Sequence, residues 1–161
     1  MTIVWKFTNQ KELNKSEFID YVERKVFRTI RKYQMLPKDK TISLKKSNSL
    51  NATVLKHIIE TKFQTKTSTK PSLSSDNLSQ VAEEIFENVL NGKFKGPTPN
   101  DKPLYYLSDK EIELYAKLKN IKGTKRKTDK QIQSLFEKFL KKNQDLELNI
   151  IKALSQINET R

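Results

Sequence analysis

The sequence predicts a mostly α-helical protein with one or two short strands, and two observations support this fold class. Apolar residues recur at helical spacing in several separate segments of the chain. The five prolines lie between these segments, where they do not interrupt a helix. A length of 161 residues favours a single domain spanning 1–161, large enough to bury a modest hydrophobic core.

The first predicted part is residues 1–63, which we expect to be helical and basic. Its first 13 residues show no clear period. From Asn14 onward, apolar residues follow one face of a helix, and Asn14 with Glu17 matches a capping box at its start. Pro37 ends this helix, because the residue before a proline avoids the α region.

A short strand and a second helix are predicted next. Apolar and polar residues alternate from Thr41 to Leu44, which indicates a strand. Residues 51–63 again carry apolar side chains on one helical face. The following stretch, 64–76, is rich in Ser, Thr and Lys and contains Pro71, so we expect it to be a loop.

Residues 77–161 are predicted to form a helical C-terminal part. An amphipathic helix runs from Leu78 to Leu90, and Gly92 stands where a glycine commonly closes a helix. The prolines between 92 and 103 require a loop. Further helices are expected to begin near Ser108, Thr128 and Asp145. Glu111 completes a capping box with Ser108, and Thr128 is expected to open its helix together with Gln131.

Charge is distributed unevenly along the chain. Residues 1–70 carry a net charge of +10 out of the +13 of the whole sequence. A protein with such a basic half is attracted to polyanions, which are nucleic acids or acidic membrane surfaces.

The face of the first helix opposite to its apolar residues is strongly cationic, and only two acids lie between residues 23 and 46. One interpretation is an ordinary solvated face. The other is a helix that contacts phosphates, which arginine suits because its planar guanidinium binds two phosphate oxygens at once. The apolar face has the width of a core-facing one, which weakens the membrane interpretation. The candidate RNA-binding residues here are Arg24, Lys25, Arg28, Arg31 and Lys32, followed by Lys38, Lys40, Lys45 and Lys46.

A second basic cluster joins two of the predicted helices. Gly123 and Thr124 leave the backbone accessible there, so this loop can lie against a phosphate backbone or remain solvated. Tyr105 and Tyr106 can stack on bases, although such residues pack more often against a neighbouring helix. The candidate RNA-binding residues of the loop are Lys122, Lys125, Arg126 and Lys127.

The composition excludes several kinds of chemistry. The sequence has no cysteine, which excludes disulfides, thiolate metal sites, iron–sulfur clusters and thiol catalysis. A single histidine, His57, and three glycines give little material for a metal site, a catalytic triad or a phosphate-binding glycine loop. No apolar run approaches the roughly 20 residues that span a bilayer. We therefore expect a cytoplasmic protein with no enzymatic activity, cofactor, metal, small-molecule substrate or membrane partner.

Five collinear segments together resemble the archaeal tRNA 2-thiouridine synthetases, the TtuA-type PP-loop ATPases. Phe18 to Tyr33 is similar to the helix before the nucleotide loop of that family. The next segment is similar to the strand, nucleotide loop and following helix of the family. The remaining three are similar, in order, to a later helix, to the segment after that helix and to the closing pair of helices. These four segments are Ile42 to Ile58, Asn77 to Lys93, Lys102 to Ala116 and Ile132 to Ile157.

The sequence also departs from the pattern of this family. The family's nucleotide loop reads Ser-Gly-Gly-Lys-Asp-Ser, whereas Lys46 to Asn51 contains no glycine. The cysteines that bind zinc and the cluster are missing, and only a dozen residues between Phe63 and Asp76 stand where the family has much of its sheet. The resemblance therefore implies a degenerate, truncated relative, with a small Rossmann-like remnant of the PP-loop strand element and without the catalytic, nucleotide or metal residues.

Four functions are compatible with these features. The leading hypothesis is a non-catalytic RNA-binding protein that is a structural constituent of the ribosome. Such a protein would bind rRNA and contact neighbouring ribosomal proteins. The alternative is an accessory tRNA-binding subunit of a tRNA 2-thiolation (sulfurtransferase) complex. An active sulfurtransferase is disfavoured by the lack of cysteine. The fourth function is that of a DNA-binding protein. It stays open because net charge does not distinguish the A-form helix of RNA from the B-form helix of DNA.

Overall fold

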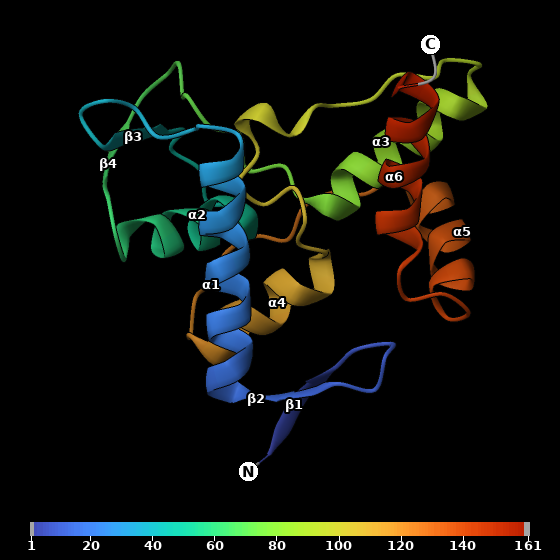
Figure 1. Ribbon diagram of the computed structural model, residues 1–161, viewed down its shortest axis with the longest axis horizontal. Coiled ribbons are helices and arrows are strands. Elements are labelled where there is room, and N and C mark those ends of the chain that lie inside the picture. The colour runs from blue at the N-terminus through green and yellow to red at the C-terminus, as the bar shows by residue number, and fades with distance from the viewer. Residues whose placement is uncertain (1, 160–161) are drawn as a thin grey trace.

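A computed structural model describes residues 2–159 and shows a mixed α/β fold, 51% helical with two small sheets (Figure 1). The predicted combination of amphipathic helices with a minor strand element is confirmed in this coarse form. The strands are more numerous than expected, since four form within residues 2–159 where one or two were predicted.

The N-terminal residues form a hairpin that the sequence did not reveal. Strand β1 (Ile3–Lys6) pairs antiparallel with β2 (Glu12–Asn14), and the turn between them places Gln10 at a φ of 69°. Both strands are short and their register shifts between Ile3 and Trp5, so no alternating pattern is visible in the sequence.

Helix α1 (Lys15–Lys32) follows directly and begins at the predicted capping box. The Asn14 side chain accepts a hydrogen bond from the Glu17 amide, and the Glu17 carboxylate accepts one from the Asn14 amide. Its apolar face is buried along its length, at Phe18, Val22, Val26 and Ile30.

The next three elements form a β–α–β unit. Strand β3 (Thr41–Leu44) leads into helix α2 (Leu50–Glu60), which returns to strand β4 (Gln64–Thr67), and β4 pairs parallel with β3. The predicted strand at 41–44 is confirmed, but the predicted loop 64–76 is wrong over its first four residues, which form β4. Strand β4 has no recognisable sequence pattern, because its residues are polar and mostly exposed. The strand forms by pairing with the buried strand β3.

Residues 77–159 form four helices, as expected. They are α3 (Leu78–Leu90), α4 (Asp109–Leu118), α5 (Lys130–Leu140) and α6 (Leu146–Glu159), with a single 3-10 turn, Pro99–Asp101, in the proline-containing loop. The third helix, α5, is capped by Asp129 and not by the predicted Thr128, because the Asp129 side chain accepts hydrogen bonds from the Gln131 and Ile132 amides. Gly92 follows α3 with a φ of 73°, a left-handed conformation that glycine adopts without strain.

Two hydrophobic clusters hold these elements together. The larger cluster joins the N-terminal hairpin, α1, β3, α2 and α4, and the smaller one lies mainly between α3 and α6. Figure 1 shows the same division, with α3, α5 and α6 to one side of α1, α2 and the β3–β4 sheet. Helix α4 therefore packs with the N-terminal elements although it lies within the predicted C-terminal part. None of the helices in the described residues is long and apolar enough to cross a membrane.

Candidate functional site: a lysine-lined cleft

A cleft of about 670 Å³ opens where β3 ends and α2 begins. Its walls come from the β3–α2 connection, the first turns of α2, β4 and residues 122–124, which follow α4. The carboxyl ends of two parallel strands meet here, which is where ligands bind in open α/β sheets. The β–α–β unit therefore positions this cleft.

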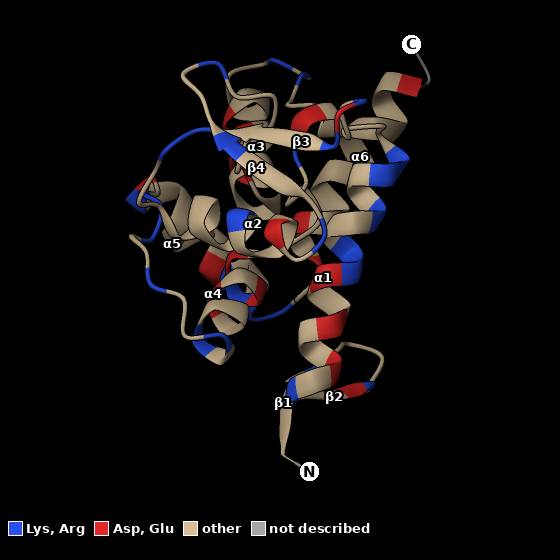
Figure 2. Cartoon of the chain, turned by 90° about the vertical axis from the view of Figure 1, so that its left-hand side faces the viewer, with Lys and Arg blue, Asp and Glu red and all other residues tan. Residues whose placement is uncertain are grey.

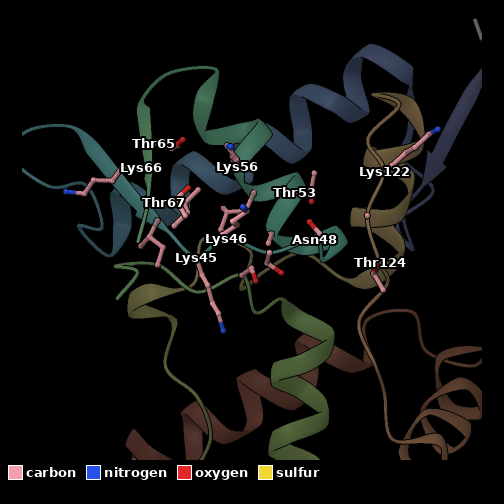
Figure 3. Close-up of a pocket in the computed structure, with 17 residues that line it drawn as sticks. Lys45, Lys46, Asn48, Thr53, Lys56, Thr65, Lys66, Thr67, Lys122 and Thr124 are labelled. Carbon is pink, nitrogen blue, oxygen red and sulfur yellow. The ribbon is translucent and has the colours of Figure 1, made fainter. Parts of the chain in front are cut away.

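The cleft is positively charged. Five of its 17 lining residues are lysines, and no Asp, Glu or aromatic residue occurs among these described lining residues. Figure 3 shows Lys46 and Lys56 at its centre, whereas the side chains of Lys66 and Lys122 extend outward at opposite ends. The remaining lining residues are Ser, Thr and Asn side chains together with leucines, an alanine and a glycine. The five lysines are Lys45, Lys46, Lys56, Lys66 and Lys122.

Most backbone amides at the start of α2 already donate hydrogen bonds within the protein. Ser49 N–H donates to the Ser47 hydroxyl, and Leu50 N–H donates to the Thr124 carbonyl at 2.8 Å. Ala52 and Thr53 donate to the side chain and the carbonyl of Ser49. A phosphate-binding loop presents its amides to the ligand. Here an anion must bind mainly through the lysine side chains.

The predicted cationic residues of α1 lie on a separate surface. Arg28 and Arg31 are exposed, and Arg24 is exposed but pairs with Asp20 at 2.9 Å. Lys25 is half-buried and lies 3.6 Å from the Glu111 carboxylate, while the Lys32 ammonium lies over the rings of Tyr33 and Tyr106. Figure 2 shows the basic residues along the outer side of α1.

The remaining predicted cations divide between the turn after α1 and the cleft. Lys38 and Lys40 are exposed in the connection from α1 to β3. Lys45 and Lys46 line the cleft. In Figure 3, which looks into the cleft, α1 lies behind α2. These two lysines therefore belong to the cleft and do not extend the cationic face of α1.

The basic loop 122–127 is only partly available to a ligand. Lys122 lines the cleft and Lys127 is exposed, whereas Lys125 lies 3.5 Å from the Glu113 carboxylate. Arg126 is held between two carboxylates of the protein, Glu83 and Asp109. The prediction that Arg126 contacts RNA conflicts with this geometry, because all three guanidinium nitrogens already donate to carboxylates.

Sequence patterns did not reveal Lys56 and Lys66 as members of the site. Lys56 is a single lysine in the sequence of α2, and its ammonium lies 3.9 Å from the Glu60 carboxylate. Lys66 lies in the unpredicted strand β4. Tyr105 and Tyr106 pack within the protein. Tyr105 is buried, and the Tyr106 hydroxyl lies 2.8 Å from that of Tyr33.

The metal-binding capacity of the chain is low. It has no cysteine to hold an iron–sulfur cluster or a structural zinc. Residues 2–159 also contain no group of three His, Asp or Glu side chains placed to hold a metal ion. The described residues therefore do not fit an iron–sulfur cluster.

The fold has a counterpart among solved structures. The U34-tRNA thiolase NcsA from Methanococcus maripaludis, determined with its [4Fe-4S] cluster, matches over 98% of this chain and 84% of that chain with a TM-score of 0.70. The fold resembles that of a tRNA thiolase. This confirms, at the level of fold, the resemblance to tRNA-thiolating enzymes found in the sequence segments.

Sequence comparisons add no closer assignment. The identity to the thiolase is 12%, so the likeness concerns the fold alone. No family model matches the chain, and no curated protein matches it.

Proposed function

We propose that this chain is a non-catalytic RNA-binding protein that binds tRNA as an accessory subunit of a tRNA-thiolating complex. The observation that carries the proposal is the lysine-lined cleft, free of acids among its described residues, on a fold shared with a tRNA thiolase. The fold likeness favours tRNA over rRNA, and it lends no support to a ribosomal role.

The chemistry of the cleft suits an RNA backbone better than a nucleotide. Its lysines supply charge that can follow phosphates, and the described lining offers no aromatic side chain for a base to stack on. The amides at the start of α2 are mostly engaged, so the cradle that a triphosphate requires is lacking. Binding should therefore depend strongly on salt and weakly on sequence.

The lack of cysteine and the glycine-free loop support a role without catalysis. A catalytic partner would then supply the sulfur chemistry, and this chain would supply tRNA contacts from the cleft and from α1.

The test is filter binding of a tRNA transcript across a range of salt concentrations. A cleft variant replaces Lys45, Lys46 and Lys56 with Gln, and a matched variant replaces three exposed lysines elsewhere, Lys141, Lys142 and Lys152. If all three cleft lysines contact phosphates, the slope of log K against log salt falls by roughly 2 to 3 for the cleft variant, since each contact contributes about 0.7–0.9.

The matched variant has the same net charge and should keep nearly the wild-type slope. If both variants lose the same amount of salt dependence, tRNA binding follows from net charge and not from a defined site. That result would contradict the role of the cleft. Absence of salt-dependent tRNA binding by the wild-type protein would contradict the proposed function itself.

A further inference from the structure

The segment between α4 and α5 closes one side of the cleft. Lys122, Gly123 and Thr124 line the cleft, and Arg126 follows two residues later. This segment, residues 122–126, is not part of the β–α–β unit, so its position depends on contacts of its own. Besides the exposed contact between Lys125 and Glu113, the described structure shows two anchors, one on each side of Lys125.

The first anchor is a close backbone contact with the start of α2. Leu50 N–H donates to the Thr124 carbonyl at 2.8 Å, and Thr124 N–H donates to the Asn48 carbonyl at 2.9 Å. A Cβ on Gly123 would lie 2.7 Å from the Leu50 Cα and 2.9 Å from its nitrogen, which is closer than such atoms approach. Only glycine fits this contact without displacing backbone.

The second anchor is the guanidinium of Arg126. Its Nη1 and Nη2 donate to the two oxygens of Glu83 on α3 at 2.7 and 2.8 Å. Its Nε and Nη2 donate to Asp109, the first residue of α4, at 2.9 and 2.7 Å. The Arg126 side chain is only 11% exposed. Burial opposes the charge of Arg126, but the hydrogen bonds and charges of Glu83 and Asp109 outweigh it and raise the pKa of the guanidinium.

We infer that Arg126, with Glu83 and Asp109, is a positioning cluster that holds residues 122–124 against the cleft and thereby supports RNA binding without touching RNA. The inference rests on the proposed function of the cleft. Glu83 and Asp109 would then support RNA binding although their carboxylates repel phosphate and cannot bind it directly.

A positioning role for Glu83 and a purely electrostatic effect predict opposite changes in RNA affinity when this glutamate is replaced. The Glu83→Gln substitution makes the chain more positive by one charge, so a protein that binds RNA by charge alone should bind more tightly. If Glu83 positions the cleft wall, the same substitution frees Arg126 from one partner and loosens the segment that carries Lys122. RNA binding should then weaken.

The experiment measures tRNA binding and its salt dependence for Glu83→Gln, with Glu84→Gln as the matched control. Glu84 is the exposed neighbour on α3 and loses the same charge. We expect Glu83→Gln to lower affinity by up to roughly five- to eightfold at 0.1 M salt, the size of one lost phosphate contact. Glu84→Gln should bind as tightly as the wild type or slightly more tightly. Circular dichroism and the melting temperature establish that each variant is folded.

Three further variants separate positioning from direct contact and from misfolding. Arg126→Lys keeps the charge but cannot bridge two carboxylates with a planar fork, so it should weaken binding, whereas a phosphate contact would survive. Gly123→Ala disturbs the other anchor and leaves the Arg126 contacts in place, and it should cause a similar loss. In a Lys122→Gln background, Glu83→Gln should weaken binding little further, because both changes remove the same contact.

Two results would overturn the inference while the proposed function stands. One is wild-type or tighter tRNA binding by folded Glu83→Gln. The other needs one more variant, Arg126→Gln, which removes the charge. Full retention of affinity by Arg126→Lys together with loss of affinity in Arg126→Gln would make Arg126 a direct ligand. If the wild-type protein shows no salt-dependent binding to tRNA, the proposed function and this inference both fail.

Discussion

Glu147 on α6 should make the stability of the protein fall as the pH rises towards neutrality. The residue is 9% exposed, and its Oε2 is buried without a hydrogen-bond partner in the described structure. Burial raises the pKa of Glu147 to about 7, with the negative charges of Asp109 and Glu83 adding to the effect while Ser79 and Arg126 oppose it. The folded protein therefore retains a proton that the unfolded chain releases.

The size of this effect follows from the two pKa values. The pKa of the glutamate rises from the ordinary 4.5 to about 7, and each unit corresponds to about 1.36 kcal/mol, so the difference is roughly 3 kcal/mol. Because the pKa of Glu147 is raised in the folded protein, the free energy of unfolding keeps this contribution below about pH 4.5. The contribution is lost progressively as the pH rises through 7. Above pH 8 no further change from this group is expected.

The Glu147→Gln variant isolates this contribution. At pH 8 the free energy of unfolding should exceed that of the wild type by up to about 3 kcal/mol, and the difference should shrink as the pH falls towards 5. Urea unfolding at several pH values measures it, with the exposed Glu84→Gln as control. A difference between Glu147→Gln and wild type that stays constant from pH 5 to 8 would refute the assignment of a raised pKa to this carboxyl.

Three other predictions concern the cationic helix and the expected absence of cofactors. If the exposed cations of α1 contact phosphates, replacing all four with Gln should flatten the slope of log K for RNA binding against log salt by about 0.7–0.9 per contact. The circular dichroism spectrum should stay the same. An unchanged slope would identify a solvated face. Calorimetry should detect no saturable ATP binding, because the amides at the start of α2 are mostly engaged, and micromolar affinity would contradict this. Elemental analysis should find no stoichiometric zinc or iron, and chelators should leave the melting temperature unchanged; about one metal per chain would argue for a site made of oxygen ligands. The four cations of the first prediction are Arg24, Arg28, Arg31 and Lys32.

The sequence predicted the elements whose boundaries depend on local chemistry. Asn14 and Ser108 both cap helices through boxes with the residue three positions later, and Gly92 takes the left-handed conformation after α3. These signals lie within four residues of the boundary they define, so they can be recognised without knowledge of the tertiary structure. The amphipathic faces of α1 and α3 likewise follow from spacing alone.

The sequence did not predict features that depend on contacts between distant segments. Strand β4 has no apolar alternation and forms only because β3 lies beside it. Arg126 lies 17 residues from Asp109 and 43 from Glu83, so nothing local distinguishes it from the exposed cations on either side. The cleft itself needs the β–α–β unit and the segment after α4 to come together, which no motif in either segment indicates.

If this chain binds tRNA, tRNA should be the RNA that accompanies it in the cell. The tagged protein can be purified from its source cells at low salt and its associated RNA sequenced, with sedimentation showing whether it travels with ribosomal particles. We expect tRNA to be enriched in fractions lighter than ribosomal subunits, and this enrichment to be lost when Lys45, Lys46 and Lys56 are replaced with Gln. Enrichment of rRNA together with cosedimentation with a ribosomal subunit, or the absence of any enriched RNA, would contradict this expectation.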